Sequence, residues 1–344
     1  MHYKTLLGTL LFAFAMVLGT AQAQDAATPG EGVTLSPGLA TWDSARPTDA
    51  VYRAMLEQLG YEVEASTSLA NPIFYQSVAQ GDVDYWTDGW FPLHNSQLPE
   101  NFEQNAKIAG TVAAGGALQG YLVDKASVEE YGITSLDDFK RDEVKEAFDS
   151  NGDGMADLVA CPPGWGCEIV INHHLDAYDL RDSINPITAA YNASFADALA
   201  RYNNGEPILF YTWTPNFTTF ELVPGEDVEW INVPSIDPTE DQVGLEDAMV
   251  ISDVEGAVSN PLTMGFIAND IDVVANNAFL EENPAAAKLF EVASIPLEDI
   301  TEMTARINAG EDSDEDVAAM AQEWISNHQE EVDGWLEEAR AAAQ

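Results

Sequence analysis

Two cysteines six residues apart, Cys161 and Cys167, enclose the sequence PPGWG. Glycine on both sides of Trp165 permits a sharp turn and lets another group approach the backbone closely. A bond between the cysteines would hold this turn rigid and present an indole and backbone N–H groups from one loop. Such a loop suits a small ligand that carries both a cation and an anion. A disulfide-closed surface turn with a packed tryptophan would have the same sequence.

The first 23 residues are typical of a secretory signal peptide. Lys4 precedes an apolar run from Leu6 to Leu18, and Ala21-Gln22-Ala23 fits a small-residue cleavage site. The run is too short to span a bilayer comfortably, so we expect export to the periplasm, cleavage near Ala23 and no membrane insertion. In an oxidising compartment two close cysteines usually pair, which favours a disulfide over a metal site or a catalytic thiol.

The charge of the chain is extreme, at −46 with 59 acidic and 13 basic residues. Removing residues 1–23 removes one lysine and leaves a net charge near −47. This excludes nucleic acid and anionic membrane surfaces as partners. Because the composition is 46% hydrophobic with eight tryptophans, the chain is expected to fold. Molar salt would screen its self-repulsion, which favours a salt-adapted protein over an ordinary acidic exported one.

Strand and helix patterns alternate along the chain. Val33–Leu35 and Tyr61–Val63 are predicted strands on either side of a predicted helix, Pro47–Leu59, and this unit indicates a parallel sheet covered by helices. The mature length is sufficient for two domains. Further helices are predicted over Ser135–Phe148, Cys167–Tyr178 and Ser313–Ala343, the last with Trp324 and Trp335 facing inward.

Three tryptophans follow predicted strands. Trp90 comes after Asp82–Trp86, and Trp213 lies two residues after the end of Pro207–Tyr211. Trp165 lies in the cysteine loop, which also follows a strand. Since ligands of open α/β sheets gather beyond strand ends, the three indoles are expected to converge. Converging indoles favour a quaternary ammonium, which has no N–H to donate and is held by cation–π attraction.

The anionic end of such a ligand would need hydrogen-bond donors. A helix that begins at the cysteine loop offers the backbone N–H groups of Gly166 and Cys167. His94, which follows the Trp90 strand, is a further candidate donor and would bind an anion better when protonated. A structural hydrogen bond within its own loop is the alternative role for His94.

A turn before the cysteine loop resembles a calcium-binding loop. Its candidate ligands are Asp149, Asn151, Asp153 and Asp157, with glycine at the sixth position. The twelfth position is Ala160, so the bidentate glutamate is missing. We therefore expect an acidic turn, with a metal site as the weaker hypothesis, and no cofactor.

Catalytic motifs are missing from the sequence. We find no nucleophile elbow, no zinc-protease HExxH and no free thiol beside a histidine. Asp84 and Asp88 could form a carboxylate pair, but acidic residues are so abundant that we interpret their proximity as chance. The sequence favours a binding protein over an enzyme.

Three segments carry a resemblance to a known family. Pro163–Glu168, Tyr211–Pro215 and Trp90-Phe91-Pro92-Leu93-His94 resemble the signature segments of the periplasmic glycine betaine-binding protein of the proline/glycine betaine ABC importer. The resemblance implies that Trp90, Trp165 and Trp213 form the ammonium box. It also implies that His94 with the Gly166 and Cys167 backbone holds the carboxylate, and that Cys161–Cys167 is the family disulfide.

The resemblance further implies a type II periplasmic-binding-protein fold, with two α/β lobes joined by a hinge and a ligand cleft between them. We expect lobe 1 over residues 24–120 and 268–344, and lobe 2 over residues 121–267. The protein would act as a monomer and deliver its ligand to an ABC permease driven by a cytoplasmic ATPase.

Glycine betaine is the expected ligand, with proline betaine as a second one and choline or another quaternary ammonium as the alternative. The chain departs from the family pattern in the loop Thr41–Arg46 and in the acidic segment Ser235–Val258. Within that loop Trp42 is expected to pack in the cleft wall, or else to join or cap the box.

Overall fold

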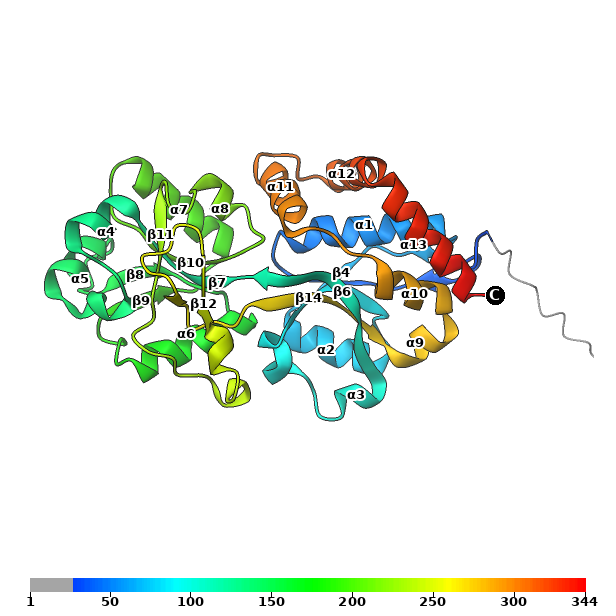
Figure 1. Cartoon of the computed structure of the whole chain (residues 1–344), viewed down its shortest axis with the longest axis horizontal. Coiled ribbons are helices and arrows are strands. Elements are labelled where there is room, and N and C mark those ends of the chain that lie inside the picture. Colours follow the sequence, from blue (N-terminus) through cyan, green and yellow to red (C-terminus); the bar gives the residue numbers. More distant parts are fainter. Residues whose placement is uncertain (1–26) are drawn as a thin grey trace, which may run out of the picture.

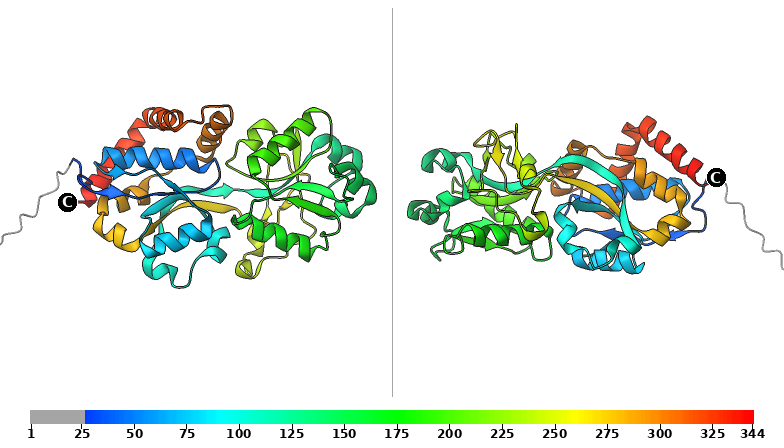
Figure 2. Two further views of the ribbon diagram at one scale, coloured as in Figure 1. Left: turned by 180° about the vertical axis from the view of Figure 1, so that it is seen from behind. Right: turned by 60° about the horizontal axis from the view of Figure 1, so that its bottom comes forward.

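A computed structural model describes residues 27–344, so the predicted signal peptide lies outside the described residues. The molecule is elongated and consists of two α/β halves that lie beside each other along its long axis (Figure 1). Only extended ribbons run between the halves in the two further views (Figure 2). The C-terminus lies in the half that also contains the N-terminal elements.

One half, called here the three-stranded half, is built on an antiparallel sheet of order β5-β14-β6. Helices lie on both sides of this sheet (Figure 1). Its elements are β1 (Thr34–Leu35), β2 (Gly38–Leu39), α1 (Ala45–Gln58), β3 (Glu62–Val63), β4 (Thr67–Ser68), α2 (Asn71–Gln80), β5 (Tyr85–Phe91), the 3-10 helix η1 (Leu93–Gln97), α3 (Phe102–Asn105), β6 (Ala106–Ala117), β14 (Asn269–Asn276), α9 (Asn277–Glu282), α10 (Pro284–Val292), α11 (Leu297–Asn308), α12 (Asp314–Asn327) and α13 (Gln329–Ala342).

The other half, the five-stranded half, has a mixed sheet of order β11-β7-β10-β8-β9. Its β8, β9 and β10 run parallel to one another, whereas β7 runs antiparallel to β10 and β11. Its elements are β7 (Gln119–Asp124), α4 (Lys125–Tyr131), η2 (Leu136–Lys140), α5 (Asp142–Phe148), β8 (Ala156–Val159), α6 (Gly166–Ala177), β9 (Ile184–Ile187), α7 (Tyr191–Asn203), β10 (Leu209–Trp213), α8 (Thr218–Glu221), β11 (Val228–Ile231), η3 (Glu240–Gln242), η4 (Glu246–Met249), β12 (Val250–Ile251) and β13 (Leu262–Thr263).

The chain crosses between the halves twice. It leaves the three-stranded sheet at the end of β6, Ala117, and enters the five-stranded sheet at Gln119. It returns between β13 and β14, whose first residue is Asn269. The two sheets share no strand, and the backbone joins the halves only through these two segments of the described chain.

The predicted strand–helix–strand unit near the start is confirmed. β1 and β3 pair in parallel, and α1 connects them. Val51, Met55 and Leu56 on α1 are fully buried, as their helical spacing predicts. The main sheet of this half is nevertheless antiparallel, with β14 paired between β5 and β6.

Two helices predicted as continuous are each interrupted. Ser135–Phe148 divides into η2 and α5 at Arg141, which is extended and whose guanidinium donates to the Tyr131 carbonyl at 2.8 Å. Ser313–Ala343 divides into α12 and α13 at His328. The imidazole Nδ1 of His328 lies 3.0 Å from the Trp324 carbonyl oxygen, so a side chain takes part in ending α12.

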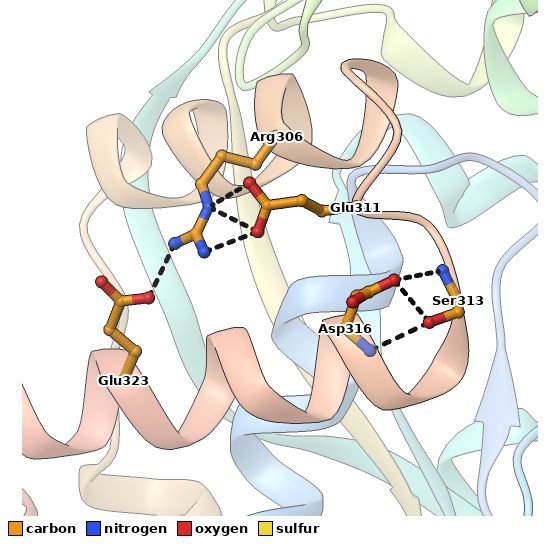
Figure 3. A network of polar contacts seen from close by, with 5 residues as sticks. All are labelled: Arg306, Glu311, Ser313, Asp316 and Glu323. Carbon is orange, nitrogen blue, oxygen red and sulfur yellow. Dashed lines mark hydrogen bonds and ion pairs between the residues drawn. The ribbon is translucent and has the colours of Figure 1, made fainter.

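Ion pairs and a capping box hold the turn into α12 (Figure 3). Arg306 on α11 contacts Glu311 at 2.7 Å and Glu323 at 3.0 Å. Ser313 caps α12 by accepting from the Asp316 N–H at 3.1 Å, and Asp316 accepts from the Ser313 N–H in return. Trp324 is buried as predicted, and Trp335 is partly buried against it.

No helix between residues 27 and 344 is long and apolar enough to cross a bilayer.

Candidate ligand-binding site

A small cavity lies between the two halves. Both halves contribute to its wall, which is mostly aromatic. The lining residues are Trp42, Trp90, Leu93, His94, Gln119, Trp165, Gly166, Cys167, Tyr211 and Trp213. All six residues predicted to bind a ligand are therefore brought together in one cavity, and Trp42 joins them.

Two of the tryptophans lie within strands and not in the loops after them. Trp90 lies inside β5 and Trp213 is the last residue of β10, whereas both were expected in the loops after these strands. Trp165 precedes the first residue of α6, as expected for the cysteine loop. Each of these three side chains is at most 8% exposed.

Trp165 lies at the centre of the aromatic wall. Its ring is perpendicular to that of Trp213, at 5.3 Å between centroids, and nearly perpendicular to that of Trp42, at 5.4 Å. Tyr211 extends this wall beside Trp213, at 6.1 Å. The rings therefore present faces and edges in several directions, as needed to surround a compact group rather than to stack on a flat one.

The disulfide between Cys161 and Cys167 is formed, with Cα atoms 6.0 Å apart. Gly164 within the loop has φ of 92°, a conformation that glycine adopts readily. Gly166 is restricted by space instead, because a Cβ atom there would lie 2.9 Å from both His94 and Leu93 of the opposite half. The glycines thus permit the turn and the close approach of the two halves.

The N-terminus of α6 is the polar end of the cavity. The first residues of a helix have backbone N–H groups without intrahelical acceptors, and no side chain caps this helix. Gly166 and Cys167 both line the cavity, so an anion placed there would meet these N–H groups and the positive end of the helix dipole.

His94 is buried and neutral. Burial lowers its pKa to about 3, so the protonated form considered from the sequence is not the form present at neutral pH. Its Nδ1 accepts from the Trp90 backbone N–H at 3.1 Å and lies 2.7 Å from the Tyr75 hydroxyl. The ring proton is therefore on Nε2, and the Asn71 amide nitrogen 3.0 Å away, which is itself a donor, does not accept from it. His94 thus takes part in structural hydrogen bonds and also lines the cavity beside Gly166.

The loop that precedes α1 connects the halves at the cavity. Thr41 accepts a hydrogen bond from the Trp165 indole at 2.8 Å, and Ser44 accepts one from the Trp213 indole at 3.3 Å. Asp43, between them, accepts from the Asn192 amide. Both cavity-lining indoles of the five-stranded half, those of Trp165 and Trp213, are therefore oriented by a hydroxyl of the other half.

The turn Asp149–Asp157 uses its carboxylates internally. Asp149 accepts from the backbone N–H groups of Gly152, Asp153 and Gly154. Asp157 accepts from Ser150 and from two asparagine amides. In the part of the chain that the structure describes, no three side chains of the metal-binding types are grouped for an ion. The carboxylates of Asp149 and Asp157 thus close the turn through hydrogen bonds of its own.

Leu93, Gln119 and Tyr211 line the cavity but were not predicted as site residues. Tyr211 lies two residues before Trp213 on β10, so the alternation of a strand places both on one face. Its hydroxyl donates to the Gln119 side chain at 2.6 Å, across the β10–β7 pair. The two-residue period of the strand could have predicted that Tyr211 lines the cavity. Gln119 could not be predicted in this way, because its position depends on the register between two strands that are distant in sequence.

Comparison with known proteins gives a consistent result. A family model described as the substrate-binding domain of ABC-type glycine betaine transport systems matches residues 33–327. The glycine betaine/proline betaine-binding periplasmic protein of Salmonella typhimurium is 38% identical over 335 residues, which cover 97% of this chain and 98% of that protein.

Two solved structures share the fold. Lactococcal OpuAC, in a closed conformation complexed with glycine betaine, aligns with a TM-score of 0.66 at 20% identity, covering 88% of this chain and 99% of that one. An ABC-transporter choline-binding protein in complex with choline gives 0.66 at 19%, covering 90% and 96%. The predicted periplasmic-binding-protein fold is thereby confirmed.

Proposed function

The chain belongs to the family of substrate-binding domains of ABC-type glycine betaine transport systems, and from this membership we propose how it holds its ligand. Glycine betaine, with proline betaine as a second ligand, occupies the cavity between the halves. Its trimethylammonium group lies among Trp90, Trp165 and Trp213, with Trp42 as a fourth aromatic wall. The observation that carries this proposal is the convergence of these indoles, from both halves, on one small cavity.

The wall suits a cation that cannot donate a hydrogen bond. No lysine, arginine or carboxylate is among the residues that line the cavity, and its histidine is neutral. Cation–π attraction contributes roughly 0.5–2 kcal/mol per contact. The methyl groups also displace water from apolar ring faces, which adds a hydrophobic contribution.

The ligand carboxylate would lie at the N-terminus of α6. The Gly166 and Cys167 N–H groups donate to it, and the Nε2–H of His94 is a further donor. Charge-assisted hydrogen bonds of this kind are stronger than neutral ones. Cation and anion are then held at opposite ends of the cavity, which selects the zwitterion by length as well as by charge.

Closure of the halves would complete the site. We propose the lobe boundaries expected from the sequence, 24–120 with 268–344 and 121–267, and a hinge at the two crossings. The closed, ligand-bound monomer docks on a permease driven by a cytoplasmic ATPase. The mature protein acts in the periplasm after cleavage near Ala23 and performs no catalysis.

Titration of the mature protein with glycine betaine, proline betaine, choline and proline tests this proposal. Calorimetry at molar salt should show saturable binding of both betaines and none of proline. Trp165→Ala should abolish betaine binding, whereas the matched control Trp335→Ala, far from the cavity, should retain it. Absence of betaine binding by folded protein would contradict the proposal.

Choline is the alternative ligand that the titration must distinguish from glycine betaine. It has no carboxylate, so the α6 N-terminus would have no partner in its complex. Tight choline binding with weak betaine binding would retain the aromatic box and reassign the substrate.

A further inference from the structure

Asp88 is a buried acidic residue directly behind the aromatic wall. It lies within β5, between Trp86 and Trp90, and is only 3% exposed. Alternation along the strand places Asp88 and Trp90 on one face, and the register of β5 against β14 shifts between Trp86 and Gly89. The Asp88 carboxylate accepts a hydrogen bond of 2.6 Å from the Trp90 indole N–H. Asp88 itself is not among the residues that line the cavity, so the indole separates it from the ligand space.

Among residues 27–344, no lysine, arginine or histidine forms an ion pair with Asp88. Burying an unpaired carboxylate is strongly unfavourable. Burial accordingly raises the pKa of Asp88 to about 7, although the Trp90 and Trp42 indoles lower it. The Trp42 N–H itself makes no hydrogen bond of ordinary geometry.

The groups that surround Asp88 supply no positive charge. Tyr75 on α2 is neutral, because burial raises its pKa well above the ordinary value, with the Asp88 charge as a further cause. His94 on η1 is neutral as well. On the neighbouring strand β14, Asp272 is a second acid, whose pKa burial raises to about 6. On α1, the ion-paired Asp49 and Arg53 act on the pKa of Tyr85 and are not among the groups that shift the pKa of Asp88.

We propose that Asp88 is a specificity-determining residue of the site, and that the quaternary ammonium of the bound ligand is its missing counter-ion. This inference rests on the proposed function. The carboxylate acts across the Trp90 ring, so the negative potential that favours a cation comes from behind the wall and not from a charged residue that lines the cavity.

The arrangement also strengthens the wall itself. A carboxylate that accepts an indole N–H makes the ring more electron-rich, which increases the attraction of its face for a cation. An uncharged ligand of the same shape would leave Asp88 buried and unpaired. Selection between a trimethylammonium and a tert-butyl group, which ring faces alone distinguish weakly, would therefore depend on this residue.

Asp88→Asn tests the proposal, because it removes the charge and keeps an acceptor for the Trp90 N–H. Binding of glycine betaine is compared with that of tert-butylacetate, its uncharged-end analogue, by calorimetry at pH 8. The variant should bind betaine about tenfold more weakly and should lose most of the preference for betaine over tert-butylacetate. Asp84→Asn is the matched control, since Asp84 accepts from the Ser36 N–H and does not touch the aromatic wall.

The pH dependence gives a second readout. A cation binds preferentially to ionised Asp88, so the wild-type affinity for betaine should rise between pH 6 and pH 8 and then level off. Asp88→Asn should flatten this profile, while Asp84→Asn should retain it. Because the variant removes an unpaired buried charge, its ligand-free form should also melt higher than wild type at pH 8, which shows that weakened binding is not misfolding.

Unchanged betaine affinity, preference and pH profile in Asp88→Asn would overturn the proposal while leaving the betaine site intact. Wild-type protein that binds neither betaine nor choline at any pH would instead refute the proposed function.

Discussion

Each indole of the cavity is held by a different partner. Trp90 donates to Asp88, Trp165 to Thr41 and Trp213 to Ser44. Trp42 makes no hydrogen bond of ordinary geometry and is held by ring contacts with Trp165 and Trp86. Its contribution to binding should therefore come from its ring alone.

Trp42→Ala should weaken betaine binding about tenfold, the loss of one cation–π contact of about 1.4 kcal/mol. Trp42→Phe should lose less, since it keeps an aromatic face. Calorimetric dissociation constants for both variants check this order. Equal affinities for the wild type and the alanine variant would show that Trp42 is only a structural part of the wall.

His174 on α6 should make the protein sensitive to acid. It is 1% exposed, and burial lowers its pKa to about 3. Below about pH 6.5 the unfolded chain binds a proton at this histidine and the folded one does not, so stability falls as the pH falls. Between pH 7 and pH 5 this contributes a loss of about 2 kcal/mol.

Urea unfolding of His174→Gln at pH 7 and pH 5 measures that contribution. Relative to wild type, the variant should show a pH-dependent change smaller by about 2 kcal/mol. If both proteins lose or gain the same stability over this interval, the buried neutral state of His174 is not a source of acid sensitivity.

At the residue scale, the side chains that line the cavity could be predicted from the sequence. The residues that hydrogen-bond to them from behind could not. The three tryptophans and the α6 N–H donors line one cavity as expected. Asp88 was interpreted as one of many surface acids, because composition does not distinguish a buried carboxylate from an exposed one. Its position two residues before Trp90 on a strand was the available signal.

At the scale of elements, the loop Thr41–Ser44 acts as an interlock. Its hydroxyls and carboxylate contact Trp165, Trp213 and Asn192 of the opposite half. Because these hydrogen bonds cross between the halves, they stabilise the arrangement in which both halves line the cavity.

Thr41→Val keeps the side-chain size and removes the acceptor of the Trp165 N–H. Betaine affinity should fall several-fold, since a lost hydrogen bond of this kind contributes about 1 kcal/mol. The loss should appear mainly as faster dissociation in stopped-flow fluorescence. An unchanged dissociation rate would contradict the interlock.

The disulfide should stabilise the loop that begins α6. Replacing both cysteines by serine should lower the free energy of unfolding by about 2 kcal/mol, as a short closed loop predicts. Thermal unfolding of this variant, and of wild type with and without reductant, measures the effect. A reduced wild type that melts at the oxidised temperature would show that packing alone orders the loop.

Element boundaries depended on tertiary contacts that local patterns do not encode. The strands that carry Trp90 and Trp213 extend into the residues predicted as loops, because β5 pairs with β14 and β10 with β7 up to those positions. The break at His328 has no glycine or proline to signal it. The sequence thus predicted which segments are helical, but it did not predict where a helical segment is interrupted.

At the scale of the whole molecule, the surplus of acid is distributed over a surface with few cations. One of these cations, Arg306, contacts two glutamates (Figure 3). Exposed carboxylates that lack such partners repel one another, and this repulsion extends about 10 Å at 0.1 M salt but only about 3 Å at 1 M.

The melting temperature of the mature protein should therefore rise by at least about 5 °C between 0.05 and 2 M sodium chloride. A parallel series in sucrose, which is excluded from the surface but screens nothing, separates screening from general stabilisation. A flat salt profile would contradict salt adaptation and leave an ordinary acidic exported protein.

A crystal structure of the mature protein with glycine betaine tests the central claim most directly. The ammonium should lie within about 6 Å of the ring centroids of Trp90, Trp165 and Trp213. The carboxylate should accept from the Gly166 and Cys167 N–H groups at about 2.7–3.1 Å. A ligand in the reverse orientation, or bound outside this cavity, would contradict the account.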